Sequence, residues 1–403
     1  MSISRSVAED RGHPMIDAIA AIGDASDIGC WSGIPYHFWQ AALRTGWKTE
    51  PIRIRLEQAT WRRRVWNLQQ LLQARGTGGF QYSEDFSDWA WQFAPASLRA
   101  AHVLSFHPFT PSLKRLRQAG GRLSIYFDAT HPLMFSRYNL GQSIPPRMAR
   151  EVLAAEREVY QAAERLVFFQ RWAADSAVHE CGADPAKVSV ILPGANLDLP
   201  PGFRFLDGCS GVAPDRPFRF GYVGKDWRRK GFPKLLSTVE ALNRMGFKVE
   251  LHCIGSIPDE AVRHPFVRYH GFLNKRVALQ RIVDIMAACD LGCLLSDAEA
   301  SSISVLEFLR VGVPVMATVV DGMGDLIPPD AGFCIDRSES PPAIAERVAE
   351  WLRDPAKMTI LRARARGWAE KVTWDRCLRE WAELLQAGCV RQPVRPWLGL
   401  DGN

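Results

Sequence analysis

The stretch that decides the fold is LGCLLSDAEASSISVLEFLRVGVP, residues 291–314. It begins with a short apolar run, Leu291 to Leu295, and its second half has the spacing of a helix that ends before Gly312. We therefore predict a strand, a loop and a helix. Glu299 then lies on the loop at the carboxyl end of the strand, and Glu307 lies about a turn and a half into the helix.

The predicted start of this helix is rich in hydroxyl groups. Ser301 and Ser302 precede Ile303, and a serine hydroxyl at this position can accept a hydrogen bond from the first turn. A helix start offers N–H donors and a positive dipole end, which together bind anions. With a carboxylate on either side, the loop suits a nucleotide sugar, which has hydroxyls at both ends and phosphate in the middle. An ordinary buried helix with a capping serine explains these residues equally well.

Composition narrows the class of protein. The chain has 403 residues, of which 47% are hydrophobic and 23% are charged, so we expect two or three globular domains. No apolar run approaches the roughly 18–20 residues of a membrane span, and Met1 to Asp27 lacks the pattern of a signal peptide. Nine scattered cysteines without a CxxC pair indicate reduced thiols in a cytoplasmic protein rather than disulfides or a metal site.

The net charge of +6 is partly local. Lys48, Arg53, Arg55 and residues 62–64 bring basic side chains close together, among several tryptophans. A basic, tryptophan-rich surface can contact anionic lipid headgroups at the inner face of a membrane, or a nucleic acid. We favour a solvated helix face whose arginines lie over tryptophans, keep peripheral membrane contact open, and consider nucleic acid the least favoured partner.

Two series of alternating strands and helices predict two parallel sheets, each covered on both faces. A Pro/Gly-rich interval, residues 200–217, separates them. Helices are predicted for 86–101 and for 375–386, and the end, 392–403, is predicted to be irregular. The predicted strands are 27–31, 51–55, 102–106, 123–127, 166–169 and 188–192 in the first series, and 218–223, 249–254, 267–272, 290–295 and 315–319 in the second.

The second series opens with a basic turn, VGKDWRRKG, residues 223–231. A glycine after a strand, followed by Lys225, Arg228, Arg229 and Lys230, forms a plausible cradle for a diphosphate. The spacing is neither that of a P-loop nor that of a GxGxxG dinucleotide fingerprint. Taken alone, the turn is better explained as a basic surface loop.

Combined, these motifs resemble the retaining family-4 (group 1) glycosyltransferases of GT-B fold. The motifs of the second series are Gly224-Lys225, Trp227, Lys230-Gly231, Gly271-Phe272-Leu273-Asn274-Lys275, the pair Glu299 and Glu307, Gly312, Pro314-Val315, Asp321-Gly322 and Gly324-Asp325. Those of the first resemble a bacterial branch of the family, and they are Trp31-Ser32-Gly33-Ile34-Pro35-Tyr36, Asp128-Ala129-Thr130, Trp172-Ala173-Ala174-Asp175-Ser176, Lys187-Val188 and Gly194-Ala195-Asn196-Leu197.

The resemblance implies an architecture. Two Rossmann-like domains would face each other across a cleft, with residues 1–205 on the acceptor side and residues 212–372 binding the nucleotide sugar. C-terminal helices would return to the first domain, with a helix from about 375 to 403 packing on it.

The resemblance also implies an activity, which is metal-independent transfer of a sugar from a nucleotide-diphosphate sugar to a saccharide or lipid-linked acceptor, with retention of anomeric configuration and without a cofactor. An inactive sugar-nucleotide-binding protein and a sugar-nucleotide epimerase of the same fold remain alternatives.

Roles for donor-binding residues follow from the same resemblance. Gly224, Lys225 and Lys230 would hold the diphosphate, and Glu307 would hold the ribose hydroxyls. The backbone from Gly271 through Phe272 to Leu273 would face the base. Gly33 would lie under the sugar and phosphate from the opposite domain, and Ser301, Ser302 and Ile303 would present the helix start to the donor.

The catalytic roles implied by the resemblance concern three residues. Glu299 would approach the transferred sugar, where positive charge grows as the glycosidic bond breaks. Asp128 could accept the proton of the acceptor, with His131 as a second candidate. An Asx turn at Asp128 and a surface position for His131 are the structural alternatives. Two positions depart from the usual pattern of the family. Ser302 stands where the family usually has glycine, and the first-domain strand that often ends in a histidine is followed here by Asp128-Ala129-Thr130-His131, as in the branch that the chain resembles.

Overall fold

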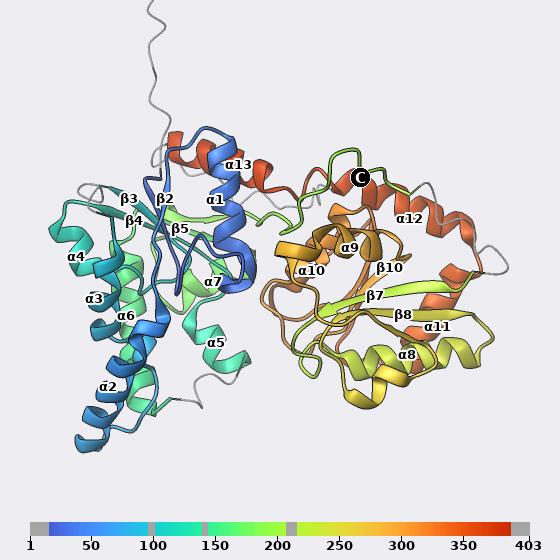
Figure 1. Ribbon diagram of the computed structural model, residues 1–403, viewed down its shortest axis with the longest axis horizontal. Coiled ribbons are helices and arrows are strands. Elements are labelled where there is room, and N and C mark those ends of the chain that lie inside the picture. Colours follow the sequence, from blue (N-terminus) through green and yellow to red (C-terminus); the bar gives the residue numbers. More distant parts are fainter. Residues whose placement is uncertain (1–15, 96–100, 139–143, 207–215, 388–403) are drawn as a thin grey trace, which may run out of the picture.

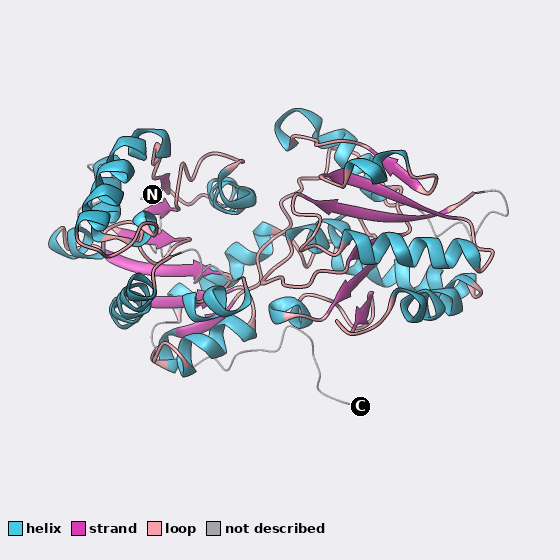
Figure 2. Cartoon of the chain, turned by 90° about the horizontal axis from the view of Figure 1, so that it is seen from below, coloured by secondary structure: helices cyan, strands magenta, loops and turns pink. Residues whose placement is uncertain are grey.

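The computed structural model describes residues 16–95, 101–138, 144–206 and 216–387. Two six-stranded sheets occupy separate halves of the molecule, each flanked by helices (Figures 1 and 2). The first sheet has the order β2-β1-β3-β4-β5-β6 and the second has the order β12-β11-β10-β7-β8-β9. Every pairing of neighbouring strands in both sheets is parallel, which confirms the predicted fold class.

The first sheet consists of β1 (Ala18–Ala20), β2 (Glu50–Pro51), β3 (His102–Ser105), β4 (Arg122–Phe127), β5 (Arg165–Phe168) and β6 (Val188–Val190). Its helices are α1 (Ile34–Arg44), α2 (Thr60–Leu72), α3 (Glu84–Ala90), α4 (Leu113–Gln118), α5 (His131–Arg137), α6 (Pro146–Ala162) and α7 (Arg171–His179).

The second sheet consists of β7 (Phe218–Gly224), β8 (Val249–Gly255), β9 (Val267–Tyr269), β10 (Leu291–Leu294), β11 (Val315–Thr318) and β12 (Gly332–Ile335). The helices that follow its strands are α8 (Phe232–Arg244), α9 (Lys275–Ala287), α10 (Ile303–Arg310), α11 (Pro341–Leu352) and α12 (Pro355–Trp368). A last helix, α13 (Trp374–Gln386), follows α12.

Burial explains why the strands of the second sheet are easier to predict from the sequence than those of the first. All residues of β10 and of β11 are buried, because helices cover both faces of the sheet. The close approach of α10 is allowed by small residues in the strands. A Cβ on Gly292 would lie 2.3 Å from the ring of Phe308, so this helix packs directly on strand backbone.

The last helix returns to the first sheet. Trp374 and Trp381 of α13 are buried in one core with Phe38 of α1 and Tyr126 of β4. The ring of Trp381 lies 5.4 Å from that of Tyr126 and 6.2 Å from that of Phe38. Figure 1 shows α13 beside α1, far from the helices that precede it in sequence. The predicted irregular end, 392–403, lies outside the described residues.

The prediction of a strand at 27–31 is wrong. The first strand is Ala18–Ala20, and the later segment contains turns and a short 3-10 helix, Cys30–Gly33. Side chains explain the difference, because the carboxylate of Asp24 accepts from the N–H of Ser26 at 2.8 Å and that of Asp27 accepts from the N–H of Gly29 at 2.6 Å. Such local bonds turn the backbone and compete with a sheet ladder.

Other predicted bounds also differ. The second strand, expected over 51–55, is only Glu50–Pro51. The helix expected over 86–101 is α3 followed by a 3-10 turn, Trp91–Phe93, and residues 96–100 are outside the described part. In the second sheet, β9 ends at Tyr269 rather than at Phe272. In the described ranges, no helix combines the length and the apolar character needed to cross a bilayer.

Candidate active site

The order of strands in the second sheet places two loops side by side. The chain runs outward from β7 through β8 to β9, and then starts again on the other side of β7 with β10. β7 and β10 are paired in parallel, so the loops at their carboxyl ends are neighbours. Such a reversal point is where ligands bind in open α/β sheets. The basic turn after β7 and the Glu299 loop after β10 therefore meet at this point.

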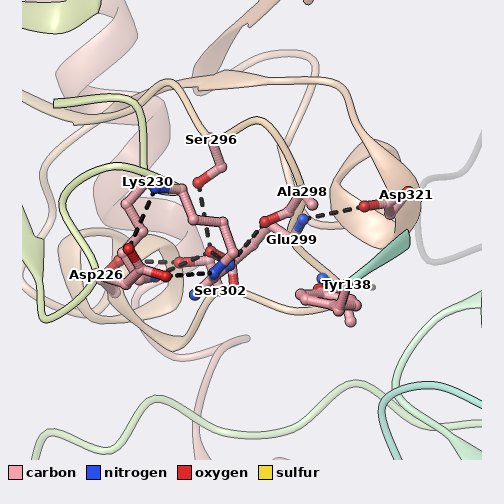
Figure 3. Close-up of polar contacts among 11 residues, drawn as sticks. Tyr138, Asp226, Lys230, Ser296, Ala298, Glu299, Ser302 and Asp321 are labelled. Atoms are coloured by element: carbon pink, nitrogen blue, oxygen red, sulfur yellow. Dashed lines mark hydrogen bonds and ion pairs between the residues drawn. The ribbon is translucent and has the colours of Figure 1, made fainter. Parts of the chain in front are cut away.

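Glu299 is the centre of the polar contacts there (Figure 3). Its carboxylate accepts hydrogen bonds from Lys230 Nζ at 2.9 Å and from Arg229 Nη1 at 3.1 Å. The hydroxyl of Ser296 donates to it at 3.3 Å. Arg229 Nη1 also donates to the carbonyl oxygen of Ala298 at 2.7 Å, which ties the basic turn to the backbone of the loop. Glu299 is only 7% exposed, so both cations neutralise a largely buried charge.

Glu307 lies inside the second domain at the first turns of α10. It is 2% exposed and forms an ion pair with the ammonium group of Lys275 at the start of α9. Burial raises the pKa of Glu307 above its ordinary value, and the charge and hydrogen bond of Lys275 only partly oppose that rise. Glu307 is thus held by a cation and points toward the region between α9 and α10.

The start of α10 has no side-chain cap. Ser302 occupies the N-cap position, but its hydroxyl pairs with that of Ser304 at 2.9 Å and accepts no bond from the first turn. The capping role expected for Ser302 is therefore wrong. The hydroxyl of Ser301 is buried and has no hydrogen-bond partner among the described residues. The N–H donors that begin with Ile303 are consequently not used by a serine side chain.

The glycine that the family usually has at position 302 is not required by the backbone here. Ser302 has φ −92° and ψ 107°, an extended conformation that any residue adopts. Gly224 does have a steric reason, because a Cβ there would lie 2.7 Å from Cδ of Lys230. A side chain at position 224 would therefore push Lys230 away from Glu299.

The residues proposed to surround the base and the outer phosphate are more open. Lys225 is exposed, and its ammonium group lies 5.5 Å from the centroid of the Phe272 ring. Phe272 is itself exposed, while Leu273 packs partly against the core of the second domain. Gly271 has φ +76°, a conformation that glycine adopts without strain. This segment thus presents a glycine turn and an exposed aromatic ring beside a cation.

Asp128 faces this site from the first domain, at the carboxyl end of β4. Burial raises the pKa of its carboxyl to about 7, and the charge of Glu299 adds to that rise against the opposing effect of backbone N–H groups. Ala129, the residue after Asp128, is buried in one apolar cluster with Ala300, the residue after Glu299, so the two carboxylates belong to segments that touch across the domain boundary. A carboxyl group with a pKa near neutrality can exchange a proton at physiological pH.

His131 has a different position from the one expected. It is 0% exposed, and its Nδ1 lies 2.9 Å from Oε1 of Glu156 in α6. The backbone N–H of His131 donates to both oxygens of that carboxylate, and the hydroxyl of Tyr160 donates to it at 2.7 Å. Nε2 has no hydrogen-bond partner in the described part of the chain. His131 therefore anchors the start of α5 rather than lying at the surface.

Gly33 is the N-cap residue of α1 and has φ +85°. A Cβ there would lie 3.0 Å from the carbonyl oxygen of Ile28, so a side chain would be strained in this conformation. His37, one turn further along α1, is buried. Its pKa is lowered to about 3 by burial first and then by the positive charge of Lys275. The charge of Lys275 in the second domain thus acts on a side chain near the start of α1.

Sequence reasoning missed the part of the site that crosses between the domains. The hydroxyl of Tyr138 accepts a hydrogen bond from the N–H of Ala300, and Arg137 Nε lies 3.4 Å from Oδ1 of Asp321. Asp321 in turn accepts from the N–H of Glu299 at 3.1 Å. Asp321 belongs to a recognised motif, but no pattern in the sequence distinguishes Tyr138, because its partner is distant in the chain.

Comparisons with known proteins give independent information. Residues 217–354 match the family model described as Glycosyl transferases group 1. The D-inositol 3-phosphate glycosyltransferase of Xylanimonas cellulosilytica is 26% identical over 257 residues, which cover 60% of this chain and 61% of that protein. The match thus spans about three fifths of the length of that relative.

Solved structures agree on the fold. A sucrose-phosphate synthase from Thermosynechococcus elongatus superposes with a TM-score of 0.65 at 15% identity, covering 92% of this chain and 98% of the other. WaaG, a glycosyltransferase involved in lipopolysaccharide biosynthesis, superposes with a TM-score of 0.61 at 15% identity, covering 92% of this chain and 100% of the other. Together with the two parallel sheets, these comparisons show a chain of GT-B fold in which residues 217–354 match the family model of group 1 glycosyl transferases.

Proposed function

We propose that this chain transfers a sugar from a nucleotide-diphosphate sugar to a saccharide or lipid-linked acceptor, with retention of anomeric configuration. One observation carries the proposal, namely that Lys230, Arg229 and Glu299 meet at the reversal point of the second sheet, beside the uncapped start of α10. That arrangement offers positive charge and N–H donors for a diphosphate, and a carboxylate for the adjoining sugar.

The charges of the site fit the breaking of a glycosidic bond. Negative charge grows on the leaving diphosphate, and Lys230 and Arg229 can stabilise it with the donors that Glu299 does not use. Because these side chains supply the positive charge, the proposed reaction is metal-independent. Positive charge grows on the sugar ring at the same time, and Glu299 lies where a carboxylate can stabilise it. In this proposal the acceptor attacks from the same face with help from the leaving phosphate.

We assign the proton of the acceptor to Asp128 rather than to His131. Asp128 lies in a segment that packs on the Glu299 loop and has a pKa of about 7, whereas His131 is enclosed and bonded to Glu156. Glu307, paired with Lys275, is the proposed contact of the ribose hydroxyls. The exposed ring of Phe272 beside Lys225 supports a base-proximal role for residues 271–273.

A two-step experiment tests this function. A thermal-shift screen with UDP-, GDP- and ADP-sugars should identify one base that stabilises the protein well above the others. The preferred donor is then incubated with saccharide and lipid-linked acceptors, and with inositol 3-phosphate because of the name of the relative, and nucleotide release is measured. Release that depends on acceptor supports transfer. Binding without release would indicate a sugar-nucleotide-binding protein, and a changed free sugar nucleotide would indicate an epimerase.

We further propose that the enzyme works at an anionic membrane surface on the cytoplasmic side, with no nucleic acid as partner. The outward side of α2 carries Trp61, Leu68 and Leu72, which are 71%, 57% and 79% exposed and lie seven and four residues apart. That spacing places them on one side of the helix, and the exposed arginines of residues 62–64 belong to the same helix. Apolar side chains beside arginines match the acyl region and the phosphates of an anionic bilayer.

Vesicle sedimentation tests the membrane contact. The protein should bind vesicles that contain phosphatidylglycerol more strongly than neutral ones, and Leu68→Glu with Leu72→Glu should abolish the preference. Ile360→Glu is the matched control, because Ile360 is also exposed (52%) but lies on α12 of the other domain. Equal binding of the double variant and the unaltered protein would exclude α2 as the contact.

A further inference from the structure

The end of α5 is one part of the first domain that touches the Glu299 loop. Tyr138 follows this helix directly, and its hydroxyl accepts the N–H of Ala300. Figure 3 shows Tyr138 beside the loop that carries Ala298 and Glu299. Leu133 of α5 is buried with Ala300 in a small apolar cluster, and Tyr138 packs against it. The guanidinium of Arg229 lies 5.7 Å from the centroid of the Tyr138 ring. Tyr138 therefore contacts both the loop and the basic turn.

Two successive backbone N–H groups of the loop donate to side chains that either follow α5 or are paired with its last residue. The N–H of Ala300 donates to Tyr138, and the N–H of Glu299 donates to Asp321 at 3.1 Å. Asp321 is itself paired with Arg137, the last residue of α5. These hydrogen bonds hold the two peptide units that flank the Cα of Glu299, and the orientation of those units determines where the side chain of Glu299 points.

The other end of α5 is also fixed. Glu156 binds the backbone N–H and the ring of His131 at the first residue of the helix, and Asp128 lies just before it. One short helix thus connects the segment that bears Asp128 to the residue that holds the Glu299 loop. The distance between the two carboxylates depends on this connection.

We propose that Tyr138 is a positioning residue, which sets Glu299 against the transferred sugar through the N–H of Ala300. The inference rests on the proposed function, because it assigns to Tyr138 a share in that reaction. It gives the first domain a direct part in forming the active site of the second. The hydroxyl is the essential group, since the ring alone cannot accept the bond of Ala300.

Steady-state kinetics of Tyr138→Phe test the proposal. The substitution keeps the ring and removes only the hydroxyl. A misplaced Glu299 should lower kcat about 10- to 100-fold, because displacement of a reacting group by a fraction of an ångström to 1 Å has effects of this size. The KM for the nucleotide sugar should change less than about threefold. Asp321→Asn should act in the same direction, and the double variant should lose less than the product of the single losses.

Tyr126→Phe is the matched control. The hydroxyl of Tyr126 donates to the carbonyl oxygen of Ile191 at 2.8 Å, in the core beneath α13. Its removal should lower the Tm and leave kcat unchanged. Tyr138→Phe should instead lower kcat and leave the Tm nearly unchanged, so a loss of stability alone cannot produce the expected result. A kcat for Tyr138→Phe within twofold of the unaltered enzyme would overturn the proposal.

Amide hydrogen exchange gives a readout that needs no turnover. Peptides covering residues 296–302 should exchange faster in Tyr138→Phe than in the unaltered protein or in Tyr126→Phe. Unchanged exchange would overturn the proposal even if kcat fell. If the unaltered protein transferred no sugar from any donor, the proposed function would fail, whereas the exchange measurement would still decide whether Tyr138 holds the loop.

Discussion

Asp128→Asn separates the charge of a carboxylate from its shape, and its effect should depend strongly on pH. The substitution keeps an oxygen that can accept the nearby backbone N–H groups but removes the titrating proton. Burial, with help from Glu299, raises the pKa of Asp128 from 3.8 to about 7. The folded protein therefore holds the proton more tightly than the unfolded chain does. The stabilising effect of that proton is complete below about pH 4 and is lost as the pH rises to about 7.

The size of the effect follows from the shift. The pKa of Asp128 rises by about three units, which corresponds to about 4 kcal/mol of unfavourable free energy once Asp128 is ionised in the folded state. Because Asp128 remains partly exposed, solvent screening reduces this value, and we expect about 2 kcal/mol. Asparagine does not titrate, so Asp128→Asn should be more stable than the unaltered protein at pH 8. At a few degrees per kcal/mol, the gain in Tm is about 4–8 °C.

The assay compares Tm values at pH 5 and pH 8 and the pH profile of kcat/KM. The stability gained by Asp128→Asn should be larger at pH 8 than at pH 5. If Asp128 takes the proton of the acceptor, kcat/KM of the unaltered enzyme should rise through about pH 7. The substitution should remove this limb and lower kcat/KM by about 10²- to 10⁴-fold.

Asp88→Asn is the control with the opposite sign. Burial raises the pKa of Asp88, but hydrogen bonds from Ser112 and Arg115 outweigh it and leave the pKa below its ordinary value. Its charge therefore stabilises the fold above the unfolded pKa, and Asp88→Asn should lower the Tm at pH 8. The reasoning about Asp128 would be refuted if Asp128→Asn changed the Tm equally at both pH values, or if the limb near pH 7 persisted.

Substitutions at three positions, Glu307, Lys230 and Ser302, probe the donor side, and variants of Lys275 and Lys225 serve as comparisons. Glu307→Gln should weaken donor binding, measured by calorimetry, at least about tenfold. It should also lower the Tm, because Lys275 loses a buried partner. Adding Lys275→Met to this variant should restore part of the Tm but none of the affinity for the donor. Lys230→Met should lower kcat by about 10²- to 10³-fold, whereas the exposed Lys225→Met should have a smaller effect in the same assay. Ser302→Gly should leave kcat/KM within about threefold, since the backbone of Ser302 is in an ordinary extended conformation.

The strands and helices of the two sheets could largely be predicted from the sequence, but the contacts between distant loops could not. Strands such as β10 and β11 are buried on both faces, so they stand out as apolar runs. The strand expected at 27–31 failed because two aspartates bind their own backbone and turn it. The basic turn and the Glu299 loop were recognisable separately, but their meeting depends on the pairing of β7 with β10, which no local pattern encodes.

The same limit explains why Tyr138 was not foreseen and why it matters. Lys230 and Glu299 lie on one domain, yet the charge of Glu299 adds to the rise that burial gives the pKa of Asp128 on the other. Because a carboxylate of one domain helps to raise the pKa of a carboxyl group on the other, the proton affinity of Asp128 depends partly on the contact between the domains. The N–H of Ala300, bonded to Tyr138, makes the geometry of the second domain depend on that contact as well. The proposed catalytic arrangement is therefore formed by the two domains together, and neither contains it alone.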